Sequence, residues 1–334
     1  MAARLAEINH FLQKHWPTGD YELSAISGDA SFRRYFRVKR QGETWILMDA
    51  PGLADDSFRF IAIADAYAKA GLVVPEVIAF DAEAGLVLLS DLGDELLQFH
   101  LHESNVIERY RQALALLPAI RQITSSDFGD FPKFDREFLL RELNIFTEWF
   151  VQKHLQIALT TEIKQLLDET FEPLVHSAMQ QVQAGMHRDF HSRNLMLQSN
   201  GSIAVIDFQD AVIGPVTYDA VSLLKDCYLS WPEELIAQLR TEFFQQLQQQ
   251  GVLAKDYEVR RFQREFELMG MQRHIKVLGI FCRLWHRDGK AGYLADLPRV
   301  FAYVLAVCDS YPEFAGFAKW LRQEVEPLLI RSLS

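Results

Sequence analysis

The first ninety residues alternate short apolar runs with turn residues, a pattern that predicts a small sheet around one helix. Residues 56–70 carry helical periodicity, and Gly71 follows them as a natural helix-ending residue. An apolar stripe in residues 1–16 predicts another helix at the start. The expected strands are residues 21–26, 34–38, 44–48, 76–80 and 86–90. The order is therefore three strands, one helix and two strands.

From residue 92 onward, apolar positions recur at helical spacing. Stripes in residues 106–117, 138–146 and 163–174 each predict one helix face. Residues 230–233 resemble a capping box that would open a helix running to Gly251. We expect an α+β protein with a sheet-containing N-terminal lobe (residues 1–91) and a helical C-terminal lobe (residues 92–334).

Composition is that of a globular protein, with 49% hydrophobic and 24% charged residues. Forty-five acidic against 34 basic residues give a net charge of −11, which disfavours nucleic acid and anionic membranes as partners. The cysteines are three, widely spaced and set among apolar neighbours, as expected of reduced thiols in a core. No signal-peptide or membrane-spanning pattern stands out. We expect a cytoplasmic protein without an obligate protein partner.

The most informative motif is His187-Arg188-Asp189, followed by Asn194 and then by Asp207-Phe208. The two aspartates are 207 − 189 = 18 residues apart. An aspartate, an asparagine five residues later and a second aspartate on an Asp-Phe pair form the catalytic pattern of protein-kinase-like phosphotransferases. In that chemistry Asp189 orients and deprotonates the attacking hydroxyl. Asn194 and Asp207 would hold the Mg²⁺ that bridges the phosphates of ATP. A polar loop before a buried strand explains the individual residues but not their joint spacing.

The sequence resembles the aminoglycoside phosphotransferase and choline kinase branch of the kinase-like superfamily. His191 carries this resemblance, because small-molecule kinases of the branch have H-x-D-x-H-x-x-N where protein kinases usually have lysine. Asp207 through Asp210 are similar to the D-F-x-D segment of the branch. The resemblance implies a two-lobed kinase-like fold, with the nucleotide base at the hinge around Leu89 and Asp91 and with His191 beside the nucleotide.

Several strings resemble a narrower group, the bacterial kinases of N-acetylmuramate and N-acetylglucosamine. The strings are residues 28–36, 45–51, 207–219, 286–290 and 293–298. This resemblance implies phosphorylation of the anomeric C1 hydroxyl of an amino sugar in peptidoglycan recycling. Two alternatives stay open: a kinase of another small hydroxyl compound such as an aminoglycoside, and a pseudokinase that binds nucleotide without turnover.

One departure from the family concerns the third strand. Its end carries Met48 where a basic residue normally contacts the nucleotide phosphates, and the following helix carries Phe60 in place of the partner glutamate. The turn formed by Gly28, Asp29, Ala30 and Ser31 could cover the phosphates with its backbone N–H groups. Arg33 or Arg34 could supply the charge, and Arg33 is favoured because it is closer to the turn. A solvated strand edge explains both arginines equally well.

The remaining candidates concern the acceptor. Glu142 and Trp149 lie where the family builds substrate-specific walls, although a tryptophan among phenylalanines is often a core residue. Asp210 is a further substrate candidate. Arg287 could meet an acidic group such as a lactyl carboxylate, or be an exposed loop charge. Asp219 is expected to hold the backbone of the catalytic loop by hydrogen bonds.

Overall fold

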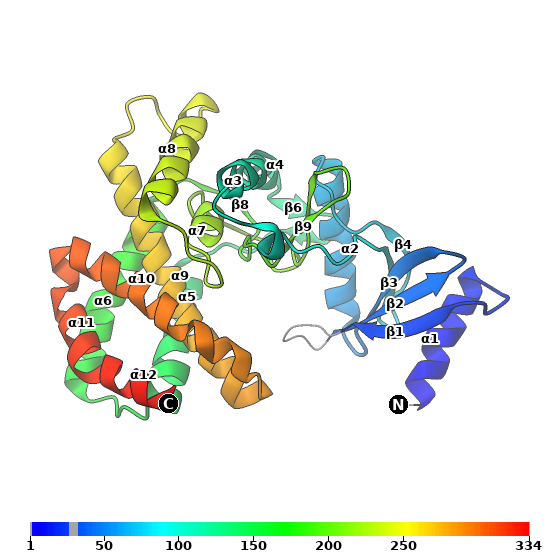
Figure 1. Ribbon diagram of the computed structural model, residues 1–334, viewed down its shortest axis with the longest axis horizontal. Coiled ribbons are helices and arrows are strands. Elements are labelled where there is room, and N and C mark those ends of the chain that lie inside the picture. Colours follow the sequence, from blue (N-terminus) through cyan, green and yellow to red (C-terminus); the bar gives the residue numbers. More distant parts are fainter. Residues whose placement is uncertain (1, 27–32, 334) are drawn as a thin grey trace.

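The protein is described by a computed structural model that covers residues 2–26 and 33–333. Its N-terminal part is an antiparallel sheet of five strands in the order β1-β2-β3-β5-β4. Figure 1 shows this sheet, with helices α1 and α2, at one end of the molecule and the helical part at the other. The bounds are α1 Ala2–His15, β1 Glu22–Ile26, β2 Arg34–Arg40, β3 Glu43–Asp49, α2 Ala54–Lys69, β4 Val77–Asp81 and β5 Leu86–Ser90.

The two faces of the sheet pack against different partners, because successive side chains of a strand point to opposite sides. Leu86 and Leu88 of β5 join Leu47 of β3 in a small apolar cluster with α1. Val87 and Leu89 face the other way, into the main core that also contains α2. The face with α2 is therefore the one continuous with the helical part of the chain.

The rest of the chain is mainly helical, with three small two-stranded sheets. Its elements up to the catalytic region are η1 Leu97–His100, α3 Val106–Leu114, α4 Leu117–Gln122, β6 Ser125–Ser126, β7 Gly129–Asp130, α5 Arg136–Ile145, η2 Phe146–His154, α6 Thr161–Gln180, β8 Gln183–Met186, β9 Leu195–Leu197, β10 Ile203–Val205 and β11 Val212–Pro215. Those that follow are α7 Tyr218–Leu224, α8 Glu233–Gln249, α9 Val259–Asp288, η3 Ala291–Asp296, α10 Leu297–Ser310, η4 Pro312–Phe314, α11 Ala315–Trp320, η5 Leu321–Val325 and α12 Glu326–Ser332.

Helix α9, 30 residues long, passes α5 and η2 very closely at Gly279. A Cβ atom at Gly279 would lie 2.5 Å from the backbone of Ile145 and Phe146. Only glycine permits this approach without movement of one helix. The close contact fixes which residues of α9 face α5, and these two helices form the walls of the cavity described below.

The predicted order of strands and helices in the first ninety residues is confirmed, with bounds that differ by at most two residues. The predicted capping box is wrong. Helix α8 begins at Glu233, its N-cap residue is Pro232, and Ser230 does not cap it. The three cysteines are buried free thiols, as expected.

Residues Ala291–Ser310 are long and apolar enough, by length and composition alone, to cross a membrane. In the fold they form η3 and α10, and Val300, Phe301 and Val304 of α10 are buried in the main core. The buried side chains are those of one face of α10, while η3 has no buried residue among those described.

Candidate active site

The loop between β8 and β9 carries Asp189, and its backbone is held by Asp219 of α7. The Asp219 carboxylate accepts hydrogen bonds from the N–H groups of His187 at 2.7 Å and Arg188 at 2.9 Å. Arg188 has a φ of 78°, in the left-handed region that non-glycine residues rarely adopt. The two hydrogen bonds compensate for that strain, and the predicted role of Asp219 is confirmed.

His187 lies fully buried beneath this loop and links it to the second aspartate. Its Nδ1 accepts the N–H of Asp189 at 3.2 Å, so its Nε2–H donates to the carbonyl oxygen of Ile206 at 3.0 Å. Burial lowers the pKa of His187, which keeps the ring neutral, as this arrangement needs. A neutral imidazole thus connects Asp189 with the residue before Asp207.

Asn194 and Asp207 meet at the other side of the loop. The Asn194 amide nitrogen donates to the carbonyl oxygen of Asp189 at 2.9 Å and to Asp207 Oδ2 at 3.4 Å. Gln209 donates to Asp207 Oδ1 at 2.5 Å. Asp207 itself has a φ of 63°, a conformation that tends to occur at functional sites. The structure therefore brings together the three side chains that the sequence pattern singled out.

The two aspartates have opposite pKa shifts. Burial disfavours ionisation of Asp189, but the positive charges of Lys276 and Arg188 outweigh it and hold its pKa below the usual range. The Asp207 side chain reaches solvent, yet the surrounding protein and then the negative charge of Asp189 raise its pKa. Asp189 is therefore a carboxylate at neutral pH, whereas at Asp207 the opposing charge of Arg33 does not reverse the upward shift.

These donors fit a hard divalent cation. Mg²⁺ prefers carboxylate and amide oxygens and keeps several waters. Asp207 supplies a carboxylate whose charge is disfavoured by Asp189 and which a cation would stabilise. Because the Asn194 nitrogen donates to the Asp189 carbonyl oxygen and to Asp207, the amide oxygen remains as the ligand atom.

A second carboxylate, Asp226, holds the far end of the loop. It accepts hydrogen bonds from Ser192 N–H at 3.1 Å and Ser192 Oγ at 2.5 Å. His191 lies between the parts of the loop held by Asp219 and by Asp226, and its ring contacts Tyr228 edge-on with ring centroids 5.3 Å apart. Burial lowers the pKa of His191 to about 4, so the ring is neutral at pH 7. Its predicted contact with nucleotide stays a prediction.

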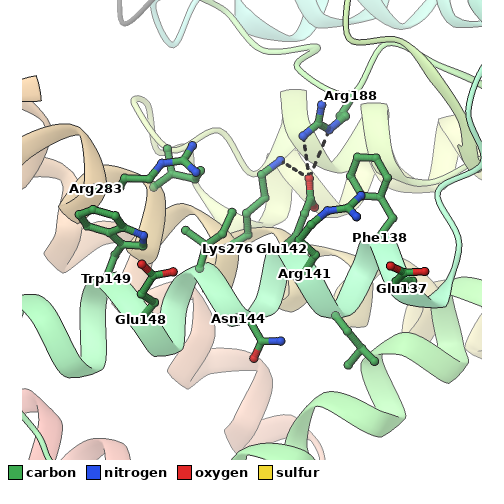
Figure 2. Close-up of a pocket in the computed structure, with 13 residues that line it drawn as sticks. Glu137, Phe138, Arg141, Glu142, Asn144, Glu148, Trp149, Arg188, Lys276 and Arg283 are labelled. Atoms are coloured by element: carbon green, nitrogen blue, oxygen red, sulfur yellow. Dashed lines mark hydrogen bonds and ion pairs between the residues drawn. The ribbon is translucent and has the colours of Figure 1, made fainter. Parts of the chain in front are cut away.

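A cavity of about 670 Å³ lies beside the catalytic loop, between α5, η2 and α9. This volume is within the usual range for small-molecule sites. Figure 2 shows a cluster of Glu142, Arg188 and Lys276 toward one end and Trp149 with Arg283 at the other. The lining residues are Glu137, Phe138, Leu140, Arg141, Glu142, Asn144, Ile145, Glu148, Trp149, Arg188, Lys276, Ile280 and Arg283.

Glu142 is 2% exposed and ties the cavity wall to the catalytic loop. Its Oε1 accepts from Arg188 Nη2 at 3.0 Å and lies 3.0 Å from Lys276 Nζ, and its Oε2 accepts from Gln272 at 3.2 Å. Both carboxylate oxygens are thus engaged by protein groups. Lys276 also donates to the Tyr218 hydroxyl at 3.2 Å. This geometry favours a positioning role for Glu142 over direct contact with substrate.

The other acceptor candidates lie in different places. Trp149 lines the cavity and also packs against the core, so both predicted roles have geometric support. Asp210 is exposed and close enough to Arg188 and His187 to affect their pKa values. Arg287 is exposed, pairs with Asp288 at 2.8 Å and belongs to the α9 end beyond the lining residues.

The predicted nucleotide side of the site contains Met48 and Phe60. Met48 is fully buried, and Phe60 stacks on Phe208 with ring centroids 5.2 Å apart. An apolar contact thus joins α2 to the segment that carries Asp207, in the region where the wider family has an ion pair. The predicted phosphate-covering turn, Gly28 to Ser31, lies outside the described residues.

Arg33 and Arg34 point to opposite faces of the sheet. Arg34 pairs with the buried carboxylate of Asp49 on the face covered by α1, where Arg4 also binds Asp49 at 2.6 Å. The Arg33 guanidinium lies 6.0 Å from the ring centroid of Phe60, and its charge acts on Asp207. Arg33 is therefore on the side of the sheet that faces α2, near the candidate metal ligand Asp207.

The hinge after β5 is held by an ion pair. Arg37 Nε donates to Asp91 Oδ2 at 2.7 Å, and the Gly93 N–H donates to Asp91 Oδ1 at 2.9 Å. The Asp91 side chain is thus engaged within the protein, and the Ser90 N–H already donates to the carbonyl oxygen of Glu76 at 2.8 Å, so the predicted contact with the nucleotide base would use other backbone groups of Leu89 to Asp91. That contact stays a prediction.

The sequence itself matches the model of the phosphotransferase enzyme family over residues 22–262. The chain belongs to this family. It is 40% identical over 301 residues to the N-acetylmuramate/N-acetylglucosamine kinase of Pseudomonas aeruginosa, covering 90% of this chain and 88% of the relative. It is 38% identical to the enzyme of the same name from Neisseria meningitidis, covering 93% of both chains. The chain is therefore a phosphotransferase whose relatives are kinases.

Solved structures confirm the kinase-like fold. The ADP-bound aminoglycoside phosphotransferase APH(2'')-Ib aligns with a TM-score of 0.61 at 15% identity, covering 88% of this chain and 96% of that one. Choline kinase LicA from Streptococcus pneumoniae aligns with a TM-score of 0.59 at 10% identity, covering 91% and 100%. The predicted resemblance to aminoglycoside phosphotransferases and choline kinases is confirmed.

Sequence reasoning missed the basic residues of the cavity. Lys276 and Arg283 lie on α9 and Arg141 on α5, and none of them belongs to a motif. A usable signal was present for Lys276, which interrupts an apolar run from Ile275 to Leu278. A lysine buried in such a run needs a partner, and Glu142 is that partner.

Proposed function

We propose that this phosphotransferase transfers the γ-phosphoryl group of ATP to the C1 hydroxyl of N-acetylmuramate and N-acetylglucosamine, in the cytoplasm, as a step of cell-wall recycling. The observation that carries the proposal is the 38–40% identity, along about nine-tenths of the chain, to kinases named for these two sugars. The cavity beside the catalytic loop supplies space for one sugar.

In this proposal the chain's own residues position the reactants. Asp189, ionised at neutral pH, accepts a hydrogen bond from the sugar hydroxyl and then its proton, as the sugar oxygen bonds to the γ-phosphorus and the bond from that phosphorus to the bridging oxygen breaks to release ADP. Asn194 and Asp207 hold Mg²⁺, which when bound offsets the negative charge of the phosphates. Arg33 approaches the phosphates from the sheet, and the hinge at Leu89 to Asp91 takes the base.

The charge of the cavity argues against an aminoglycoside as acceptor. Its lining contains the bases Arg141, Arg188, Lys276 and Arg283 against three acids, of which Glu142 is already neutralised. A substrate with several ammonium groups requires an acidic site. The ionised Asp189 and the complete set of Asn194 and Asp207 likewise speak against a pseudokinase.

A product analysis tests the proposal. Purified protein with ATP and Mg²⁺ is incubated with N-acetylmuramate, N-acetylglucosamine, kanamycin and choline, and products are examined by ³¹P and ¹H NMR. We expect an acid-labile sugar phosphate that has lost its reducing end. Phosphate on C6 with the reducing end retained would contradict the C1 assignment. Turnover of kanamycin or choline with both sugars untouched would contradict the proposal as a whole.

A further inference from the structure

The two proposed sugars differ by one charged group, and this inference rests on the proposed function. N-acetylmuramate carries a lactyl ether on C3 whose carboxylate is ionised at neutral pH, while N-acetylglucosamine has a hydroxyl there. A site that favours the charged sugar needs a cationic group that is not already neutralised inside the protein. The basic residues of the cavity wall can be compared on that criterion.

Two of the four are committed to the protein. Arg188 and Lys276 both bind the buried carboxylate of Glu142. A third, Arg141, is exposed, and its guanidinium lies over the ring of Phe138 at 4.6 Å. Arg141 keeps its charge, but its guanidinium is exposed and hydrated, so an incoming carboxylate gains less there than at a partly buried cation.

Arg283 is in a different situation. It is partly buried, and its Nε is a buried donor without a hydrogen-bond partner among the described residues. Burial, and then the positive charge of Arg287, lower its pKa. The acids that act on it electrostatically, Asp288 and Glu148, form no ion pair with it among the described residues. An incoming carboxylate would bind the part of the guanidinium that remains accessible and neutralise its charge.

The position of Arg283 suits a group on C3. It follows Lys276 by seven residues on α9, which is an advance of about 10 Å along a helix. Lys276 is close enough to Asp189 to lower the pKa of that carboxyl, so it marks the end of the cavity nearer the catalytic loop. The helical advance from Lys276 to Arg283 then leaves room for a sugar ring between them. Trp149 lies at the Arg283 end (Figure 2). We propose that Arg283 binds the lactyl carboxylate of N-acetylmuramate and sets the preference for this sugar over N-acetylglucosamine.

The test compares kcat and KM for the two sugars in the parent and in Arg283→Gln. We expect the KM for N-acetylmuramate to rise about ten- to a hundredfold, with the KM for N-acetylglucosamine changed less than about threefold. Arg283→Lys should recover part of the preference. Arg264→Gln is the matched control, because Arg264 is on the same helix but pairs with Glu313 outside the cavity.

The methyl ester of N-acetylmuramate tests the same contact by changing the substrate, because it removes the negative charge of the lactyl group. The parent should bind the ester about ten- to a hundredfold more weakly than the acid, and Arg283→Gln should no longer distinguish them. An unchanged ratio between the two sugars, an equal loss for both, or a loss of preference in Arg287→Gln instead would overturn the assignment to Arg283. A parent enzyme that phosphorylates neither sugar would overturn the proposed function first, and this inference with it.

Discussion

Lys276 Nζ lies 3.0 Å from Glu142 Oε1, and this contact joins α9 to α5 in the interior of the protein. The same oxygen binds Arg188, the neighbour of Asp189 in the catalytic loop. One buried carboxylate therefore holds two cations that in turn keep Asp189 ionised. The wall of the acceptor cavity and the charge of the proposed catalytic base depend on the same cluster.

Glu142→Gln should be strongly destabilising, because it leaves two cations in the interior with reduced charge compensation. Removal of one partner from a buried ion pair typically costs about 3–5 kcal/mol. We expect the free energy of unfolding, measured by urea denaturation, to fall by about this amount, while Glu137→Gln at the same cavity leaves it within about 0.5 kcal/mol. The double variant Glu142→Gln with Lys276→Met should recover part of the loss. An additive double variant would show that the two side chains do not interact.

Asp189→Asn should lower kcat by at least about a hundredfold while the Kd for nucleotide stays nearly unchanged. The amide keeps the size of the side chain but cannot take the proton of the sugar hydroxyl. Asp207→Ala should act differently and abolish Mg²⁺-dependent nucleotide binding, measured by calorimetry. Parental turnover in both variants would exclude the assigned chemistry.

The parts of the site that the sequence predicted are those encoded locally. Asp189 and Asn194 are five residues apart, and the turn between them follows from the chain itself. The strand bounds were predictable for the same reason, since the strands are short apolar runs bounded by turn residues such as Gly42 between β2 and β3.

The acceptor cavity was not predictable, because it depends on contacts distant in the sequence. The approach of Gly279 to Ile145 joins residues that are 279 − 145 = 134 positions apart. The role of Arg34 was ambiguous for the same reason. Its partner Asp49 belongs to the neighbouring strand, and its burial depends on the packing of α1. Local pattern alone could not separate a solvated arginine from one that neutralises a buried carboxylate.

Gly279→Ala should destabilise the fold and weaken sugar binding. The added Cβ would lie 2.5 Å from the backbone of Ile145, so α9 must move away from α5, the opposite wall of the cavity. Such overpacking typically costs about 1–3 kcal/mol. Gly270→Ala on the same helix is the control, because its Cβ would meet Val221 at an ordinary 3.5 Å and alanine favours helix by about 1 kcal/mol. Thermal unfolding of both variants checks the opposite signs, and equal shifts would contradict the argument.

Stability should fall as the pH is lowered from 7 to 5, in part through His274. Burial lowers its pKa to about 3, its Nε2 is 2.9 Å from the carbonyl oxygen of Lys225, and its ring stacks on Tyr303. The unfolded chain takes up a proton near pH 6.5 and the folded chain does not, so stability is present above that pH and is lost below it. The loss from this residue at pH 5 is about 2 kcal/mol. Urea denaturation at both pH values should show a smaller difference in His274→Gln than in the parent, and an equal difference would exclude this residue as a source.

Arg33→Ala should raise the KM for ATP about ten- to a hundredfold, because a charge-assisted contact to phosphate contributes roughly 1.5–3 kcal/mol. Successive residues of a strand point to opposite faces, and Arg33 is on the face toward Phe60 and Asp207. Arg34→Ala is the matched control. It should lower stability slightly and leave the KM for ATP unchanged, because Asp49 keeps its ion pair with Arg4 at 2.6 Å.

Met48→Lys tests whether a basic residue at the end of β3, as in the wider family, could take the role proposed for Arg33. A lysine at this fully buried position would lie in the apolar core that also contains Phe60, without a carboxylate from α2 at that place, so we expect lower stability and no gain in affinity for ATP. Steady-state kinetics over a range of ATP concentrations show whether either arginine binds the phosphates. The measurement uses Arg33→Ala, Arg34→Ala and the double variant. If the KM for ATP stays at the parental value in all three, the phosphates are held by backbone N–H groups and Mg²⁺ without either arginine. If Arg34→Ala alone raises it, the strand presents the opposite face to the nucleotide.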